Sequence, residues 1–222
     1  MPTFSSVFWI PLCSSVVLFV CKHAIQHETK PFLLSICKDQ HDKLLNDARA
    51  TKASLLVFKN LFYITMSAWA YIILKDTEIF PTWLGGTGSL ENCFKEYPFA
   101  PQIPGLLTYS LVQMGYYIED IIDHNFYKPK SNDFWEMNLH HLCTYSLYAG
   151  MIMMNTVRIG ALISFAHSFS DIFGSGIRLL SQTVYKTATV IFFFVTLAIW
   201  IISRNIVIPV MTAAAWRGQF YP

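Results

Sequence analysis

The stretch KPKSNDFWEMNLHHLCTYSLYAGMIMMNTVRIGALISFAHSFSD, residues Lys128–Asp171, determines how the rest of the chain is interpreted. Its apolar runs predict two helices joined by a short turn around Asn155–Arg158. These helices carry His140 and His141, and His167 with Asp171, among their ionisable side chains. Ionisable groups inside a bilayer are costly and normally face a protein interior or a water-filled cavity, so they indicate a functional site.

The composition supports a membrane protein. The chain has 222 residues, of which 54% are hydrophobic and 14% charged, whereas a soluble domain carries about 25% charged residues. The net charge of +2 and the scattered lysines argue against nucleic-acid binding. We therefore expect an all-α integral membrane protein.

Apolar runs predict about six transmembrane helices. Their expected ranges are Phe4–Cys21, Ser54–Leu74, Ile103–Ile122, Phe134–Asn155, Ile159–Leu180 and Thr187–Val210. The expected division is an N-terminal transmembrane helix (1–22), a polar segment with a short interfacial helix (23–52) and a transmembrane domain (53–222). The proline- and glycine-rich segment 76–102 reads as an ordered loop. Ten of the 16 Lys and Arg residues fall in 22–53, 123–134 and 178–186, which places that side in the cytoplasm or a mitochondrial matrix.

Polar residues recur at intervals of three and four in four of the expected spans, and hence along one helical face each. The set comprises Lys59, Tyr63 and Ser67; Tyr109, Gln113, Tyr116 or Tyr117, and Asp120; Asn138, His141, Tyr145 and Tyr148; and Ser164, His167, Ser168, Asp171, Ser175 and Arg178. Such faces are best satisfied by turning toward a shared cavity. The alternative is hydrogen bonding between helices of a solid bundle, but the ionisable members favour the cavity.

The histidines suggest acid–base or nucleophilic chemistry, since imidazole serves as base, nucleophile or metal ligand near neutral pH. Asp171 lies one turn after His167 and could hold an imidazole in one tautomer. We expect one of His140, His141 and His167 to lie within reach of Asp171, of Lys59 or of a tyrosine through water. A metal site is a minor alternative, because three histidines and an aspartate suit zinc or iron but the recognisable ligand spacings are absent. The expectation is no metal.

Four motifs, in this order, resemble the TLC domain family, in particular its ceramide synthase branch. They are DFxxMxxHH at Asp133–His141, RxG at Arg158–Gly160, AHxxSD at Ala166–Asp171 and RxxxxP at Arg204–Pro209. The resemblance covers about residues 52–210. It implies a six-helix barrel preceded by one outer helix, with His140 and His141 as the acyl-transfer residues and His167 and Asp171 as their partners. Residues expected at the lipid cavity are Lys59, Tyr63, Gln113, Tyr117, Asp120, Tyr145, Arg158, Ser168 and Arg204.

The chain also departs from the family pattern. KASLLVFK (Lys52–Lys59) stands where a KFxESxWR-like signature opens the second helix, Ser168 replaces the first aspartate of HDxSD, and Gly174–Ser175 replaces a later acidic residue. The sequence ends at Pro222, about where the last barrel helix is expected to begin. These departures predict an incomplete barrel with one helix missing.

Two functions remain open, and the departures rank them. The first is a TLC-fold subunit that binds lipid or supports a larger membrane assembly, with an ordered lipid in the cavity and partner subunits contacting the loop 76–102 and the tail Trp216–Pro222. The purified chain would then not acylate a sphingoid base. The alternative is an acyl-CoA-dependent N-acyltransferase of the ceramide synthase type, with acyl-CoA as co-substrate and no cofactor. The resemblance implies the endoplasmic reticulum; an assembly subunit could lie in the mitochondrial inner membrane.

Overall fold

The computed structural model describes residues 4–37, 42–127 and 133–220. Within these ranges the regular structure is helical and no β-strand occurs. The α-helices are α1 (Phe4–Ile36), α2 (Lys43–Leu74), α3 (Leu106–Ile122), α4 (Phe134–Met153), α5 (Val157–Ser181), α6 (Lys186–Ile201) and α7 (Ile208–Phe220). Two short 3-10 helices are η1 (Thr82–Leu84) and η2 (Leu90–Phe94), and two π-helical segments are η3 (Asp123–Tyr127) and η4 (Ile202–Val207). Parts of two predictions, Lys128–Asn132 of the motif stretch and Tyr221–Pro222 of the docking tail, lie outside the described residues.

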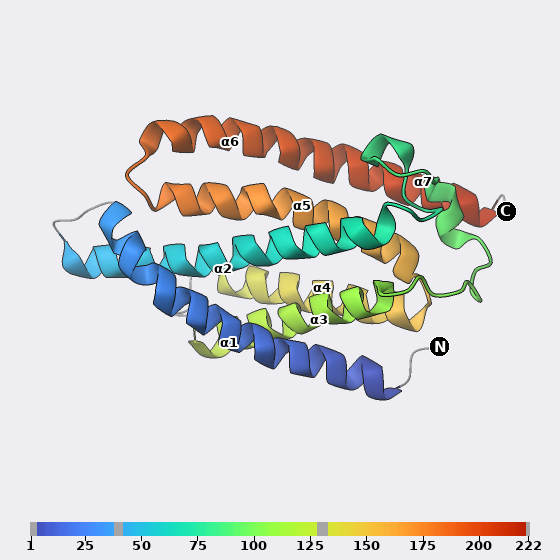
Figure 1. Ribbon diagram of the computed structural model, residues 1–222, viewed down its shortest axis with the longest axis horizontal. Coiled ribbons are helices and arrows are strands. Elements are labelled where there is room, and N and C mark those ends of the chain that lie inside the picture. Colours follow the sequence, from blue (N-terminus) through green and yellow to red (C-terminus); the bar gives the residue numbers. More distant parts are fainter. Residues whose placement is uncertain (1–3, 38–41, 128–132, 221–222) are drawn as a thin grey trace. The chain divides into compact units, whose positions relative to one another are not determined.

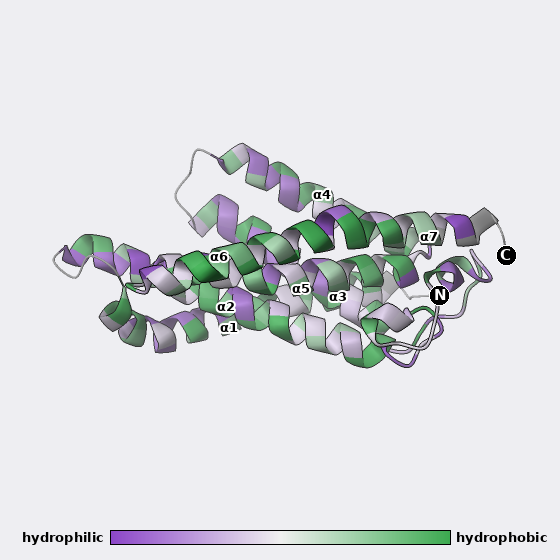
Figure 2. Cartoon of the chain, turned by 90° about the horizontal axis from the view of Figure 1, so that it is seen from above, coloured by the Kyte–Doolittle hydropathy of each residue, from purple (hydrophilic) through white to green (hydrophobic). Residues whose placement is uncertain are grey.

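The chain is an all-α integral membrane protein, as the sequence predicts. Three helical stretches are long and apolar enough to cross a bilayer, namely Ser5–Ile36, Lys43–Leu74 and Lys186–Ala214. Figure 2 shows the apolar residues that cover much of α6. Helices α3, α4 and α5 are not among these three stretches, so the count of six spans stays a prediction.

The first helix runs further than the sequence suggests. α1 was expected to end near Cys21 and continues to Ile36, while α2 already begins at Lys43. The residues that follow Cys21 include Lys, Glu, Gln and Ala, which are good helix formers. The predicted polar segment 23–52 is therefore mostly the adjoining ends of two long helices.

The loop and the turn behave as expected. Residues 76–102 form turns and the short helices η1 and η2 and contain no α-helix. The turn between α4 and α5 contains Asn155 with φ of 53°, in the left-handed region that asparagine tolerates better than most residues. Gly105, with φ of 81°, precedes α3, where a side chain would be strained.

The chain divides into two compact units. Unit 1 comprises residues 1–19, 69–162 and 212–222, and unit 2 comprises residues 20–68 and 163–211. Each unit therefore combines helical segments that are far apart in the sequence.

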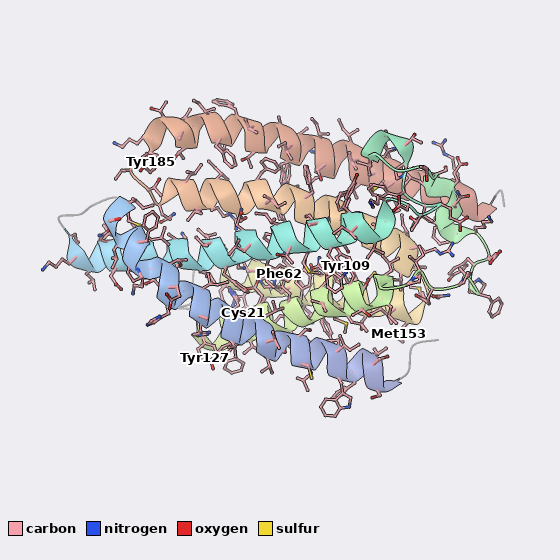
Figure 3. The ribbon with its side chains drawn as sticks, in the orientation of Figure 1. Cys21, Phe62, Tyr109, Tyr127, Met153 and Tyr185 are labelled. Atoms are coloured by element: carbon pink, nitrogen blue, oxygen red, sulfur yellow. The ribbon has the colours of Figure 1, made fainter. Side chains whose placement is uncertain are left out.

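In unit 1, α3 packs beside α4 (Figure 1). The start of α1 approaches α3 closely at Gly115, where a Cβ atom would lie 2.0 Å from the Ser14 Oγ. A larger residue there would have to push the two helices apart. Tyr109 of α3 is fully buried and meets the Trp69 ring edge-on at 5.8 Å, whereas Met153 at the end of α4 is exposed (Figure 3).

In unit 2, α5 packs beside α6, and Phe173 and Phe192 stack with ring centroids 6.0 Å apart. Asn60 of α2 donates hydrogen bonds to the Ile172 carbonyl (2.7 Å) and the Ser175 hydroxyl (2.8 Å) of α5. A small core of Leu33, Cys37, Ala50 and Ala53 joins the end of α1 to the start of α2. These contacts position the polar face of α5.

Candidate functional site

The polar stripes of α3 and α4 meet inside unit 1, as predicted for these two helices. Tyr117 of α3 and Tyr148 of α4 lie with ring centroids 5.6 Å apart. One turn earlier on α3, Gln113 is buried and donates a hydrogen bond to the Tyr109 hydroxyl (3.1 Å). The two stripes therefore form one buried polar seam between the helices.

At the end of this seam a histidine lies against a carboxylate. The Nε2 atom of His141 is 3.5 Å from an Oδ atom of Asp120, and the two side chains are only 6% and 4% exposed. A carboxylate beside Nε2 favours the tautomer with hydrogen on that nitrogen. Nδ1 is then the basic nitrogen, which is the arrangement that a carboxylate gives to imidazole in catalytic triads.

The two adjacent histidines have different environments. His141 is buried, whereas His140, whose ring centroid lies 5.6 Å away, is exposed. Neighbouring side chains on a helix point about 100° apart, so only one of them enters the seam. The structure thus brings together His141 and Asp120, but places His140 on the outer face of α4.

Sequence reasoning missed further buried titratable groups close to Asp120 in the chain, and one of them, His124, contacts the His141 ring. Glu119, Asp123 and His124 are all buried, at 3%, 6% and 7% exposure. Asp123 and His124 belong to the π-helical segment η3, and π-helical turns occur frequently at functional sites. The run EDIIDH at the end of an apolar helix, with four titratable residues in six, could have indicated them.

The residues predicted as partners of the His pair belong to unit 2. The Asp171 carboxylate accepts a hydrogen bond from Arg204 Nη2 at 2.7 Å, and their side chains are 32% and 24% exposed. Arg204 lies in the π-helical segment η4. The sequence did not predict this arginine as a partner of Asp171, and the expected contact between Asp171 and a histidine stays a prediction.

The remaining residues predicted at the site differ in burial. Ser168, in place of the family's aspartate, is buried, and His167 is half-buried on the same helix. Lys59 and Tyr63 of α2 and Tyr145 of α4 are half-buried. Their place at a lipid cavity stays a prediction.

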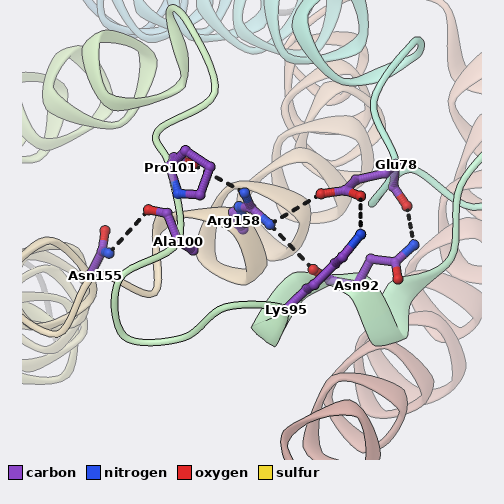
Figure 4. A network of polar contacts seen from close by, with 7 residues as sticks. All are labelled: Glu78, Asn92, Lys95, Ala100, Pro101, Asn155 and Arg158. Carbon is purple, nitrogen blue, oxygen red and sulfur yellow. Dashed lines mark hydrogen bonds and ion pairs between the residues drawn. The ribbon is translucent and has the colours of Figure 1, made fainter. Parts of the chain in front are cut away.

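Arg158 binds the loop that follows α2 (Figure 4). Its guanidinium donates to the Pro101 carbonyl (3.1 Å), the Asn92 carbonyl (3.4 Å) and the Glu78 carboxylate (3.5 Å). The neighbouring Asn155 amide donates to the Pro98 carbonyl (2.6 Å). These contacts give Arg158 a structural role in unit 1, and its predicted role at a lipid cavity stays untested.

The same loop contains a thiol with a perturbed pKa. Burial raises the pKa of Cys93 to about 12, although the positive charge of Arg158 opposes the shift. At the end of α1, burial likewise raises the pKa of Cys37, with Arg49 opposing. Both thiols stay protonated near neutral pH and are poor nucleophiles. No group of three His, Cys, Asp or Glu side chains suited to a metal ion occurs in the described part of the chain.

Comparison with known proteins agrees with these features. Residues 52–221 match the TLC domain family. The chain is 29% identical to ceramide synthase hyl-2 of Caenorhabditis elegans over 150 residues, which are 67% of this chain and 43% of that protein. It is 26% identical to ASC1-like protein 3 of Oryza sativa subsp. japonica over 215 residues (94% and 72%), and 29% identical to human ceramide synthase 5 over 115 residues (52% and 29%).

The chain therefore spans less than half the length of the nematode protein. The family match covers most of the chain and includes both helices of the buried seam. Because the histidine motif, the helical membrane fold and this match agree, the chain belongs to the TLC domain family, with ceramide synthases among its relatives.

Proposed function

We propose that this protein transfers an acyl group from acyl-CoA to the amine of a sphingoid base, the reaction type that the names of its ceramide synthase relatives indicate. The observation that carries the proposal is the buried pair of His141 and Asp120. Sequence alone favours a binding role, but a solid, purely structural seam has no need for a histidine and a carboxylate away from water, since burying charged groups is costly.

The chemistry follows from the position of the imidazole nitrogens. The amine nitrogen bonds to the thioester carbonyl carbon, and the carbon–sulfur bond of acyl-CoA breaks. Nδ1 of His141 accepts the proton that the amine loses and returns it to the departing thiolate, so that amide and CoA thiol are the products. Asp120 stabilises the imidazolium that forms in between, as general acid–base catalysis requires.

The surroundings suit lipid substrates. Helix α4, which carries His141, exposes Leu139, Leu142 and Leu147 on its outer face. An acyl chain and a sphingoid base that lie in the bilayer can approach such a helix without leaving the apolar phase. We propose the endoplasmic reticulum membrane as the location of the protein, the compartment that the family resemblance implies.

A second candidate is a lipid-binding or structural subunit of a membrane assembly. It is favoured by unit 2, where Ser168 stands in place of an aspartate and Asp171 is engaged by Arg204. Under this proposal the fold binds a lipid, and other membrane subunits cover its surface, but no acyl group is transferred.

The test uses the full chain reconstituted in lipid nanodiscs with labelled acyl-CoA and sphingosine. We expect the unmodified protein to form labelled ceramide. The rate of ceramide formation should fall at least about 100-fold in His141→Ala and change by less than about tenfold in the matched control His140→Ala. Equal losses in both variants would contradict the assignment to His141. Retained ceramide binding without any product in the unmodified protein would support the second candidate and exclude the first.

A further inference from the structure

His124 is the second imidazole of the buried seam, although it lies 17 positions before His141 in the sequence. Its side chain is buried, and its ring stacks on Phe134 with centroids 4.8 Å apart and an angle of 17°. Its Nε2 atom lies 3.1 Å from the Phe134 carbonyl oxygen. Two independent contacts therefore fix this ring against the first residue of α4.

The hydrogen bond also fixes the position of a proton. A carbonyl oxygen only accepts hydrogen bonds, so the Nε2 atom of His124 must carry hydrogen and donate it. The ring then presents its edge to His141, with centroids 5.9 Å apart and an interplanar angle of 63°. The two histidines that are buried together are thus His124 and His141. Of the two histidines adjacent in the sequence, His141 is buried and His140 is exposed.

We propose that His124 is a positioning residue for His141, an inference that rests on the proposed acyl transfer. Asp120 holds the Nε2 side of the His141 ring, while the hydrogen bond from His124 to the Phe134 carbonyl fixes η3 to α4 and so keeps the His124 side chain against the His141 ring. A ring confined in this way keeps one tautomer and one orientation, with Nδ1 as the basic nitrogen. Small displacements of catalytic groups reduce the rate by up to about 100-fold. Contacts that fix the orientation of the His141 ring therefore affect the rate.

Other ionisable groups lie next to Asp120, His124 and His141 in the sequence. Glu119 lies on α3, Asp123 lies beside His124 on η3, and His140 precedes His141 on α4. His124 stacks on Phe134 at the start of α4 and meets the His141 ring edge-on, whereas His140 is exposed. The positioning role is therefore assigned to His124.

The first experiment is enzymatic and compares three variants of the full chain in nanodiscs. His124→Phe keeps an aromatic ring on Phe134 but removes the donor, whereas His124→Gln restores an amide donor at similar reach. The control is Asn125→Ala, because Asn125 also joins η3 to α4, through a 2.7 Å hydrogen bond to Asn138, without touching His141. We expect kcat to fall about 10- to 100-fold in His124→Phe with KM unchanged, a partial recovery in His124→Gln, and little change in Asn125→Ala.

Two kinetic outcomes would overturn the inference. One is equal activity of His124→Phe and His124→Gln, because the donated hydrogen bond would then be irrelevant. The other is an equal loss in Asn125→Ala, because any tie between η3 and α4 would then suffice.

The second experiment reads the tautomer of His141 and does not depend on activity. Solid-state NMR of histidine-labelled protein in bilayers distinguishes the two neutral tautomers by ring carbon shifts, and a His141→Gln sample identifies the signal. We expect a single Nε2–H tautomer in the unmodified protein and a mixture in His124→Phe. A single tautomer in both would refute the positioning role. If the unmodified protein forms no ceramide, acyl transfer fails as its function, while the NMR result still decides the role of His124.

Discussion

Each unit contains a carboxylate that faces a basic side chain, and the two pairs differ in burial and in chemistry. In unit 1, Asp120 and His141 are almost fully buried and 3.5 Å apart. In unit 2, Asp171 and Arg204 are closer, at 2.7 Å, but their side chains are 32% and 24% exposed. The tighter contact is therefore the less buried one.

The identity of the base explains what each pair does. Arginine stays protonated in proteins and has no acceptor, so Arg204 neither takes up nor releases a proton. A histidine does both near neutral pH. The comparison teaches that the Asp171–Arg204 pair holds α5 to the π-helical segment η4, while the Asp120–His141 pair is equipped for proton transfer.

The strongest test of this difference is the same substitution at both carboxylates. Asp120→Asn removes the charge that orients His141 and stabilises its protonated form, so we expect N-acyltransfer to fall by about 10²- to 10⁴-fold. Asp171→Asn leaves the unit 1 pair in place, so we expect a loss of less than about tenfold. Ceramide formation in nanodiscs measures both.

A larger loss of N-acyltransfer in Asp171→Asn than in Asp120→Asn would contradict these assignments. It would place the chemistry at Asp171 and leave Asp120 as a structural residue. The matched change from carboxylate to amide keeps the side-chain volume, so packing is the same in both variants.

The ion pair of unit 2 is expected to affect stability. Asp171→Asn or Arg204→Gln leaves one charge without its partner, and at intermediate burial we expect about 1–3 kcal/mol of destabilisation for either. The double variant should lose less than the sum of the two, with a coupling of about 1 kcal/mol. Denaturant unfolding in mild detergent measures the free energy of unfolding of the unmodified protein, the two single variants and the double variant. Strictly additive losses would show that the two side chains are not energetically coupled.

Much of the fold could be predicted from the sequence because apolar runs and turn residues determine it locally. The ranges of α3, α4 and α5, the turn at Asn155 and the loop 76–102 all follow from this pattern. The length of α1 could not be predicted in the same way. Its polar second half satisfies helix propensity without an apolar stripe, and hydropathy alone ends the helix too early.

The site was predictable only in part. The stripes of α3 and α4 predict that Asp120 and His141 face a shared interior, but periodicity does not determine which carboxylate meets which base. Sequence proximity suggested a histidine for Asp171, which stays a prediction, and gave no sign of the contact with Arg204, 33 positions away. The role of His124 depends on a π-helical turn, which rotates side chains away from the regular helical phase and leaves no periodic signal.

Replacing Ser168 of unit 2 by aspartate, the residue that the family resemblance implies at this position, should have a small effect on the N-acyltransfer rate. Ser168 is buried at 5% exposure, so a new carboxylate there has to find a partner or stay neutral. If the chemistry lies at His141, we expect Ser168→Asp to change the N-acyltransfer rate by less than about threefold, with Ser168→Asn as the uncharged control. A gain above about tenfold in the aspartate variant alone would move the chemistry to unit 2.

The smallest expected effect concerns two buried thiols, one in each unit. Burial raises the pKa of Cys93 in unit 1 to about 12, and that of Cys37 in unit 2 rises for the same reason. Near pH 8 only about one Cys93 thiol in 10⁴ is ionised, so alkylation is slow and its rate rises about tenfold per pH unit until the pH reaches the pKa. Because its pKa is raised in the folded protein, the protonated Cys93 thiol contributes to the free energy of unfolding. This contribution is complete below the usual thiol pKa of about 8.5 and is lost as the pH rises toward 12.

Because neither thiol belongs to the charged pairs, Asp120→Asn and Asp171→Asn should leave both maleimide reaction rates within about twofold of the unmodified protein, as peptide mass spectrometry after timed labelling would measure. Protein denatured in detergent supplies the fast reference rate. A rapidly labelled Cys93 in Asp120→Asn would mean that the lost activity came from opening of unit 1, and a rapidly labelled Cys37 in Asp171→Asn would mean the same for unit 2. Slow labelling of both, together with the unequal losses of activity, is the result that assigns proton transfer to His141 and a structural role to Arg204.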